Sequence, residues 1–149
     1  MTVVDKTAPS QTDSISFELE VAHAPEKVWR ALTEPELLAQ WLLPTLDFQL
    51  APGAAFLFKT DPYPGWDGTV NCKFVEIEPH RKLSYTWAAG GDLGLDTVVT
   101  FTLTPTETGT HLSLVQSGFK PDQKRESGGA RYGWKMMGEK LVELLARIS

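Results

Sequence analysis

The sequence predicts an α+β fold in which a curved antiparallel sheet of seven strands packs around a long C-terminal helix, with two short helices after the first strand. Three observations predict it. Apolar and polar residues alternate in short segments between residues 14 and 117, which is typical of half-buried strands. The turns between most of these segments are short, so neighbouring strands are antiparallel. After Phe119 the apolar period changes from two to three or four, which indicates a helix that covers one sheet face.

The length and composition favour one globular domain without nucleic-acid or membrane partners. The chain has 149 residues, 42% of them hydrophobic, and a net charge of −5. This acidic balance excludes the basic footprint of most nucleic-acid-binding proteins. No apolar run approaches the ~20 residues of a membrane helix, and residues 1–11 lack the apolar core of a secretory signal. We therefore expect a cytoplasmic protein, either a monomer or a homodimer.

The first elements are defined by patterning and by proline. Residues 1–13 have no periodicity and predict a flexible tail, so the domain spans residues 14–149. Ser14–Val21 alternates strictly and predicts the first strand. Pro25 suits the first position of a helix, and Thr33 is expected to cap the second helix with Glu36 as its capping-box partner. Pro44 ends that helix.

Six further strands and one helix complete the prediction. Phe56, Phe58, Leu83 and Tyr85 illustrate the alternation. The segment Lys120–Glu126 mixes charges and predicts a solvated linker. The following helix is about 20 residues, or roughly 30 Å, long. The predicted strands are Leu46–Leu50, Ala54–Lys59, Gly68–Glu78, Lys82–Trp87, Asp96–Leu103 and Thr110–Ser117, and the predicted helix is Gly129–Ile148.

These residues resemble a known family. Residues 24–41 read APEKVWRALTEPELLAQW, which resembles the opening helices of START-like helix-grip domains, in the branch of homologues of the activator of the heat-shock-protein-90 ATPase. The resemblance covers about residues 14–148 and implies the helix-grip fold. Members of the wider superfamily bind lipids, hormones or antibiotics, cyclise polyketides, or assist chaperones. Further matching segments are Gly68–Val70, Glu76–Pro79, Leu83–Trp87, Gly109–Thr110, Ser117–Phe119 and Gly133–Trp134.

Aromatic side chains predict a ligand pocket between the sheet and the long helix. Large rings on both walls leave an irregular gap, and binding sites are usually concave and apolar. We expect a closed cavity; the alternative is an ordinary filled core. Met137→Trp is expected to fill the gap. The candidate ligand-binding residues are Trp41, Phe58, Trp66, Tyr85, Trp87, Phe101, Trp134 and Met137.

The loops beside the predicted sheet can act as a gate. The loop Thr60–Gly68 holds Tyr63 and Trp66, and a second, glycine-rich loop spans residues 88–94. A gate over the cavity mouth and an ordinary surface loop are the two interpretations.

Polar candidates for chemistry are few. Cys72 lies mid-strand and is interpreted as a small buried hydrophobe, and a single cysteine excludes an internal disulfide. The three histidines lack metal-ligand spacing, so neither a metal nor a cofactor is expected. Arg131 and Lys135 either pair with a ligand carboxylate at the cavity mouth or form a solvated helix face.

Three functions fit this pattern. The sequence favours a protein that binds a hydrophobic small molecule without catalysis, and it assigns no catalytic residue. A cyclase or hydrolase would add a titratable group inside the same cavity, where Tyr85 is the main polar residue expected to face inward. A co-chaperone-like interaction module would bind a chaperone or another protein and needs an exposed apolar patch.

Overall fold

The described residues form one eight-stranded antiparallel sheet. The structure is a computed structural model that describes residues 3–7, 13–62, 64–90 and 94–148. The strand order in the sheet is β1-β2-β8-β7-β6-β5-β4-β3. The strands are β1 (Val4–Asp5), β2 (Ser14–Val21), β3 (Thr45–Leu46), β4 (Ala55–Lys59), β5 (Thr69–Glu78), β6 (Lys82–Ala89), β7 (Leu95–Pro105) and β8 (Thr110–Ser117).

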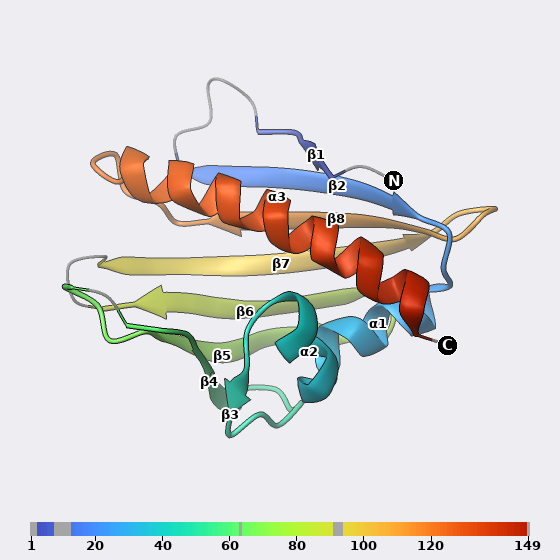
Figure 1. Ribbon diagram of the computed structural model, residues 1–149, viewed down its shortest axis with the longest axis horizontal. Helices are drawn as coiled ribbons and strands as arrows, with labels where there is room; N and C mark the ends of the chain where they lie inside the picture. Colours follow the sequence, from blue (N-terminus) through green and yellow to red (C-terminus); the bar gives the residue numbers. More distant parts are fainter. Residues whose placement is uncertain (1–2, 8–12, 63, 91–93, 149) are drawn as a thin grey trace.

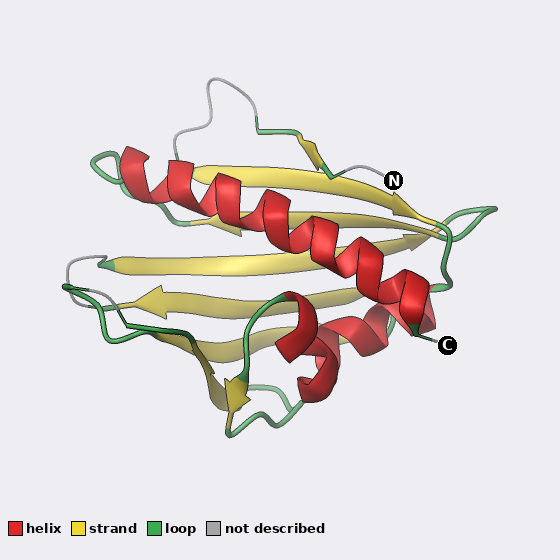
Figure 2. Cartoon of the chain, in the orientation of Figure 1, coloured by secondary structure: helices red, strands yellow, loops and turns green. Residues whose placement is uncertain are grey.

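Three helices cover one face of this sheet. They are α1 (Pro25–Thr33), α2 (Pro35–Trp41) and α3 (Lys124–Arg147). Figure 1 shows α3 running diagonally across the sheet, with α1 and α2 beside its C-terminal half. The same layers are separated by colour in Figure 2. The predicted α+β helix-grip architecture is therefore confirmed.

The sheet differs from the prediction at both edges: one edge has an additional eighth strand, and the strand at the other edge is shorter than predicted. Val4–Asp5 pairs with Glu18 and Phe17 as a short edge strand, although no regular structure is expected there from the sequence. Val3 is buried against Gly138 of α3. This contact explains why the largely polar N-terminal segment adds a strand to the sheet. The predicted strand Leu46–Leu50 is instead the two-residue β3, because Asp47 has a φ of 59° and leaves the extended conformation.

Two helix boundaries also differ. The N-cap of α2 is Glu34 and not Thr33. The Thr33 hydroxyl instead donates to the Trp29 carbonyl oxygen at 2.8 Å, so the predicted capping box is wrong. α3 begins at Lys124, five residues before the predicted Gly129. Gln123 explains the early start, because its side chain accepts from the Lys120 N–H and donates to the Gly94 carbonyl, both at 2.9 Å. The predicted linker Lys120–Glu126 is therefore partly helical.

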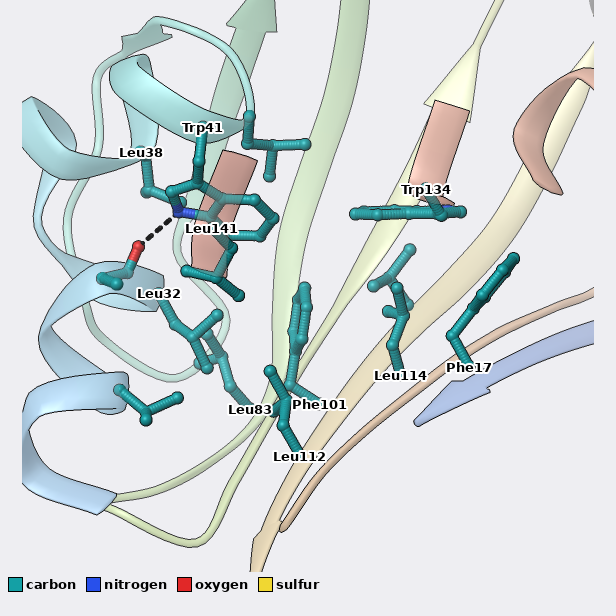
Figure 3. Close-up of a cluster of buried hydrophobic side chains, with 14 of the residues drawn as sticks. Phe17, Leu32, Leu38, Trp41, Leu83, Phe101, Leu112, Leu114, Trp134 and Leu141 are labelled. Carbon is teal, nitrogen blue, oxygen red and sulfur yellow. Dashed lines mark hydrogen bonds between the residues drawn. The ribbon is translucent and has the colours of Figure 1, made fainter. Parts of the chain in front are cut away.

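The core lies between the sheet and the C-terminal half of α3. Trp41 enters it from α2 and donates its indole N–H to the Ala31 carbonyl at 2.8 Å. Figure 3 shows Phe101 between the rings of Trp41 and Trp134, with centroid distances of 6.3 and 6.1 Å. Side chains from α2 therefore fill this half of the concave face. Within the described part of the chain, none of the helices has the length and apolar character needed to cross a membrane.

Candidate functional site

A pocket of about 680 Å³ lies beneath the N-terminal half of α3, at the end of the sheet that α1 and α2 do not cover. Exposed residues stand at its rim, so it opens to solvent and is not the closed cavity expected from the sequence. Its lining residues are Pro64, Trp66, Trp87, Leu95, Gln116, Arg125, Glu126, Gly129, Ala130, Gly133, Trp134 and Met137.

Two tryptophans from opposite layers form the pocket's inner walls. Trp87 comes from β6 and Trp134 from α3, and their ring centroids lie 5.3 Å apart with an interplanar angle of 54°. Trp87 also packs on Phe58 of the core, at a centroid distance of 5.3 Å. The buried ring of Phe58 therefore supports the Trp87 ring on the side away from the pocket.

The helical wall is made of small residues. Gly129, Ala130 and Gly133 line the pocket on α3, and Gly133 lies about one turn before Met137. A Cβ on Gly129 would meet no atom within 4 Å, whereas one on Gly133 would reach Met137 Cε at 3.6 Å. Each glycine lowers the stability of the helix by roughly 0.5–1 kcal/mol relative to alanine. In return, the missing side chains leave the space of the pocket open.

Trp66 reaches the pocket from the loop between β4 and β5. Its indole N–H donates to the Thr69 carbonyl at 2.9 Å. The loop closes where Thr60 N–H donates to the Gly68 carbonyl at 2.8 Å. Only glycine fits at position 68, because φ is +80° and a Cβ would lie 2.2 Å from the Thr60 carbonyl oxygen. This turn fixes the third tryptophan at the pocket.

A buried hydrogen-bond chain connects the two inner walls. Trp134 Nε1–H donates to Gln116 Oε1 at 2.7 Å, and Gln116 Nε2–H donates to Thr97 Oγ1 at 2.9 Å. Thr97 then donates to the Trp87 carbonyl at 2.7 Å. Gln116 is only 1% exposed, so each of these bonds satisfies a group that water reaches poorly. The chain fixes the orientation of the Trp134 ring.

Two of the charged residues at the start of α3 line the pocket, namely Arg125 and Glu126. Arg125 is exposed, whereas Glu126 is partly buried. The Glu126 Oε2 atom is shielded from water and has no hydrogen-bond partner among the described residues. The pocket therefore combines an aromatic interior with one guanidinium and one carboxylate.

The structure separates the predicted ligand-binding residues into two groups. Trp66, Trp87, Trp134 and Met137 line the pocket together. The other four are buried in the core behind it or beside it, where they contact one another. These core residues are Trp41, Phe58, Tyr85 and Phe101.

Sequence reasoning missed the polar residues of the pocket. Gln116 falls on the inward face of β8, two residues after buried Leu114, and strand alternation could have found it. Arg125 and Glu126 were not predicted to line the pocket, because the charge pattern of Lys120–Glu126 predicts a solvated linker. Arg131, considered for the cavity mouth, instead pairs with Asp5, with its Nη2 at 2.7 Å from Oδ2. Tyr63 and residues 91–93 of the proposed gate lie outside the described residues.

Two titratable side chains, Cys72 and Tyr85, are buried in the core. Burial raises the pKa of the Cys72 thiol and of the Tyr85 hydroxyl well above their usual ranges, so both are neutral near pH 7. His111 contacts Glu18, at 2.9 Å, and Glu20 on the other face of the sheet. In the described ranges, His, Cys, Asp and Glu side chains do not gather in threes that could hold a metal ion.

Comparisons with known proteins agree with this fold. The family model of the "Activator of Hsp90 ATPase homolog 1-like protein" matches residues 22–146. No curated protein matches the chain at a significant level.

Three solved structures illustrate the range of similarity. Protein MLL2253 from Mesorhizobium loti is 46% identical, with a TM-score of 0.84, and the match covers 91% of this chain and 98% of that one. Protein CV1439 from Chromobacterium violaceum is 26% identical, with a TM-score of 0.71 and coverages of 91% and 98%. DynU16, from the dynemicin biosynthetic locus, shares the fold at 23% identity, with a TM-score of 0.76 and coverages of 92% and 48%.

Proposed function

The chain belongs to the family of activator of Hsp90 ATPase homolog 1-like proteins, and on that premise we propose that it binds an apolar or aromatic small molecule without transforming it. The pocket beneath α3 carries this proposal, because three tryptophans converge on a space of about 680 Å³. That volume lies within the roughly 300–1,000 Å³ of typical small-molecule sites. We place this activity in the cytoplasm.

The chemistry of the walls supports an apolar ligand. The indole N–H groups of Trp66 and Trp134 already donate to protein oxygens. These two rings therefore offer a ligand carbon surface, which favours flat apolar groups. Gly129 and Gly133 leave room opposite the rings.

The placement of the buried titratable groups favours binding over catalysis. A general acid or base must come within hydrogen-bond reach of the reacting group. Tyr85 and Cys72 lie in the core, and burial keeps both protonated. Among the described residues that line the pocket, Glu126 is a single carboxylate without a second acid or base to work with, and the buried polar group Gln116 is an amide, which is neither an acid nor a base.

A fluorescent probe tests the proposal. N-phenylnaphthylamine, which brightens in apolar surroundings, should bind the native protein at about one site and quench tryptophan emission. Met137→Trp should abolish this binding, because Met137 lines the pocket. Met136→Trp is the matched control, because Met136 is 44% exposed on the same helix.

The outcome separates the two main interpretations. If the pocket is open, the larger side chain of Met137→Trp fills it and leaves the free energy of unfolding unchanged. If the core is already full, the same substitution overpacks it and costs about 1–3 kcal/mol of stability. A native protein that ignores the probe would remove the support for ligand binding. The protein-interaction alternative would then gain weight, since Tyr132 and Met136 are exposed one turn apart on α3.

A further inference from the structure

We propose that the pocket selects organic cations, namely ligands that join a flat apolar body to a protonated amine, with Glu126 as the counter-ion. This inference rests on the proposed function and specifies its ligand class. It comes from the three tryptophans and from the unpartnered carboxylate oxygen at the pocket.

The tryptophan rings favour a positive charge. The face of an indole ring carries negative potential, and tryptophan is the strongest cation–π partner among the side chains. Trp66, Trp87 and Trp134 reach the pocket from a loop, a strand and a helix. A ligand in the pocket therefore lies beside rings from three elements, which suits an ammonium and disfavours a carboxylate.

Glu126 supplies the complementary charge. Its Oε2 is shielded from water and lacks a hydrogen-bond donor among the described residues. A buried acceptor without a partner is costly, so a donor that reaches it gains more than it would at a hydrated carboxylate. Glu126 lines the pocket, and because the terminal torsion of a glutamate is soft, its carboxylate can turn to meet a ligand donor.

Among the described residues that line the pocket, Arg125 is the one cationic side chain, and its charge opposes this selectivity. It lines the pocket from the position next to Glu126. Because Arg125 is exposed, water already solvates its guanidinium, and a ligand carboxylate would replace water for little net gain. The shielded Oε2 atom of Glu126 therefore decides the preferred ligand charge.

Three matched probes test this inference on the full chain. Naphthylmethylamine, naphthylmethanol and naphthoate share one ring system and carry a positive, a neutral and a negative group near neutral pH. Calorimetric titration should find the amine bound about tenfold more tightly than the alcohol, and naphthoate bound most weakly.

Charge variants identify the residue responsible. Glu126→Gln should bring the amine to the affinity of the alcohol. Glu139→Gln removes the same charge from an exposed position of α3 and should keep the preference. Arg125→Gln should also keep the preference for the amine.

The failures are distinguishable. Equal binding of amine and alcohol, or a preference that survives Glu126→Gln, would overturn cation selection and leave apolar binding in place. Tightest binding of naphthoate would assign selectivity to Arg125 instead. If none of the three probes binds, both cation selection and the proposed function fail.

Discussion

Replacing Gly129 by leucine should stabilise the protein and block its pocket at the same time. Gly129 lies inside α3 and lines the pocket, and a Cβ there would meet no atom within 4 Å. Leucine is a better helix former than glycine by about 0.8 kcal/mol. That gain should raise the melting temperature by about 2–3 °C for a domain of this size.

The same leucine side chain would occupy space that a ligand needs. A steric conflict of about 1–3 kcal/mol would weaken probe binding by roughly 5-fold to 150-fold. Gly128→Leu is the matched control. Gly128 is exposed, a Cβ there also meets open space, and it lies outside the set of described residues that line the pocket.

Thermal unfolding followed by circular dichroism and a titration with N-phenylnaphthylamine measure the two effects. Both variants should be stabilised, and only Gly129→Leu should lose affinity. The reasoning is refuted if the two variants bind the probe equally well, or if Gly129→Leu is destabilised by several kcal/mol, since the space beside Gly129 would then not be open.

Two substitutions and one labelling experiment test the core and the hydrogen bonds of Gln116. Trp29→Ala should cost about 3–5 kcal/mol in urea unfolding, because Trp29 is only 7% exposed, and probe affinity of the folded variant should not change. Cys72 should resist iodoacetamide in the native protein and react in urea, as mass spectrometry can show, because burial raises the pKa of its thiol; fast native labelling would contradict this. Gln116→Leu should lower the unfolding free energy by about 1–3 kcal/mol, because it leaves the buried Trp134 N–H without its acceptor, and unchanged stability would argue against that bond.

The sequence could predict which face of each element turns inward. Alternation placed Phe58, Tyr85 and Phe101 on the concave face of the sheet, and helical spacing placed Trp134 and Met137 opposite them. The period of a strand specifies a face, because successive side chains point to opposite sides. All five residues do point inward in the structure.

The sequence could not predict where along that face the pocket lies. The two-residue alternation of a strand does not indicate which part of its inward face stays uncovered. That depends on which side chains the helices pack against it. Trp41 of α2 packs against Phe101 at 6.3 Å and fills one half of the face. The pocket is left at the other half, beneath Gly129 and Gly133, which local patterning presents only as weak helix formers.

The polar part of the site was hidden for a different reason. The segment before Gly129 contains three charges in succession, at Lys124, Arg125 and Glu126, followed by serine and two glycines. Local propensity favours a loop there. Gln123 anchors the segment through side-chain contacts to Lys120 and Gly94, and such tertiary contacts override weak propensity.

The indole N–H signals of the five tryptophans test the central claim most directly. In a two-dimensional ¹⁵N–¹H spectrum recorded during titration with N-phenylnaphthylamine, the signals of Trp66, Trp87 and Trp134 should shift together, because these residues line the pocket. Those of Trp29 and Trp41, which are buried outside it, should stay in place. Shifts confined to Trp29 and Trp41, or a spectrum that the probe leaves unchanged, would contradict a ligand site beneath the N-terminal half of α3.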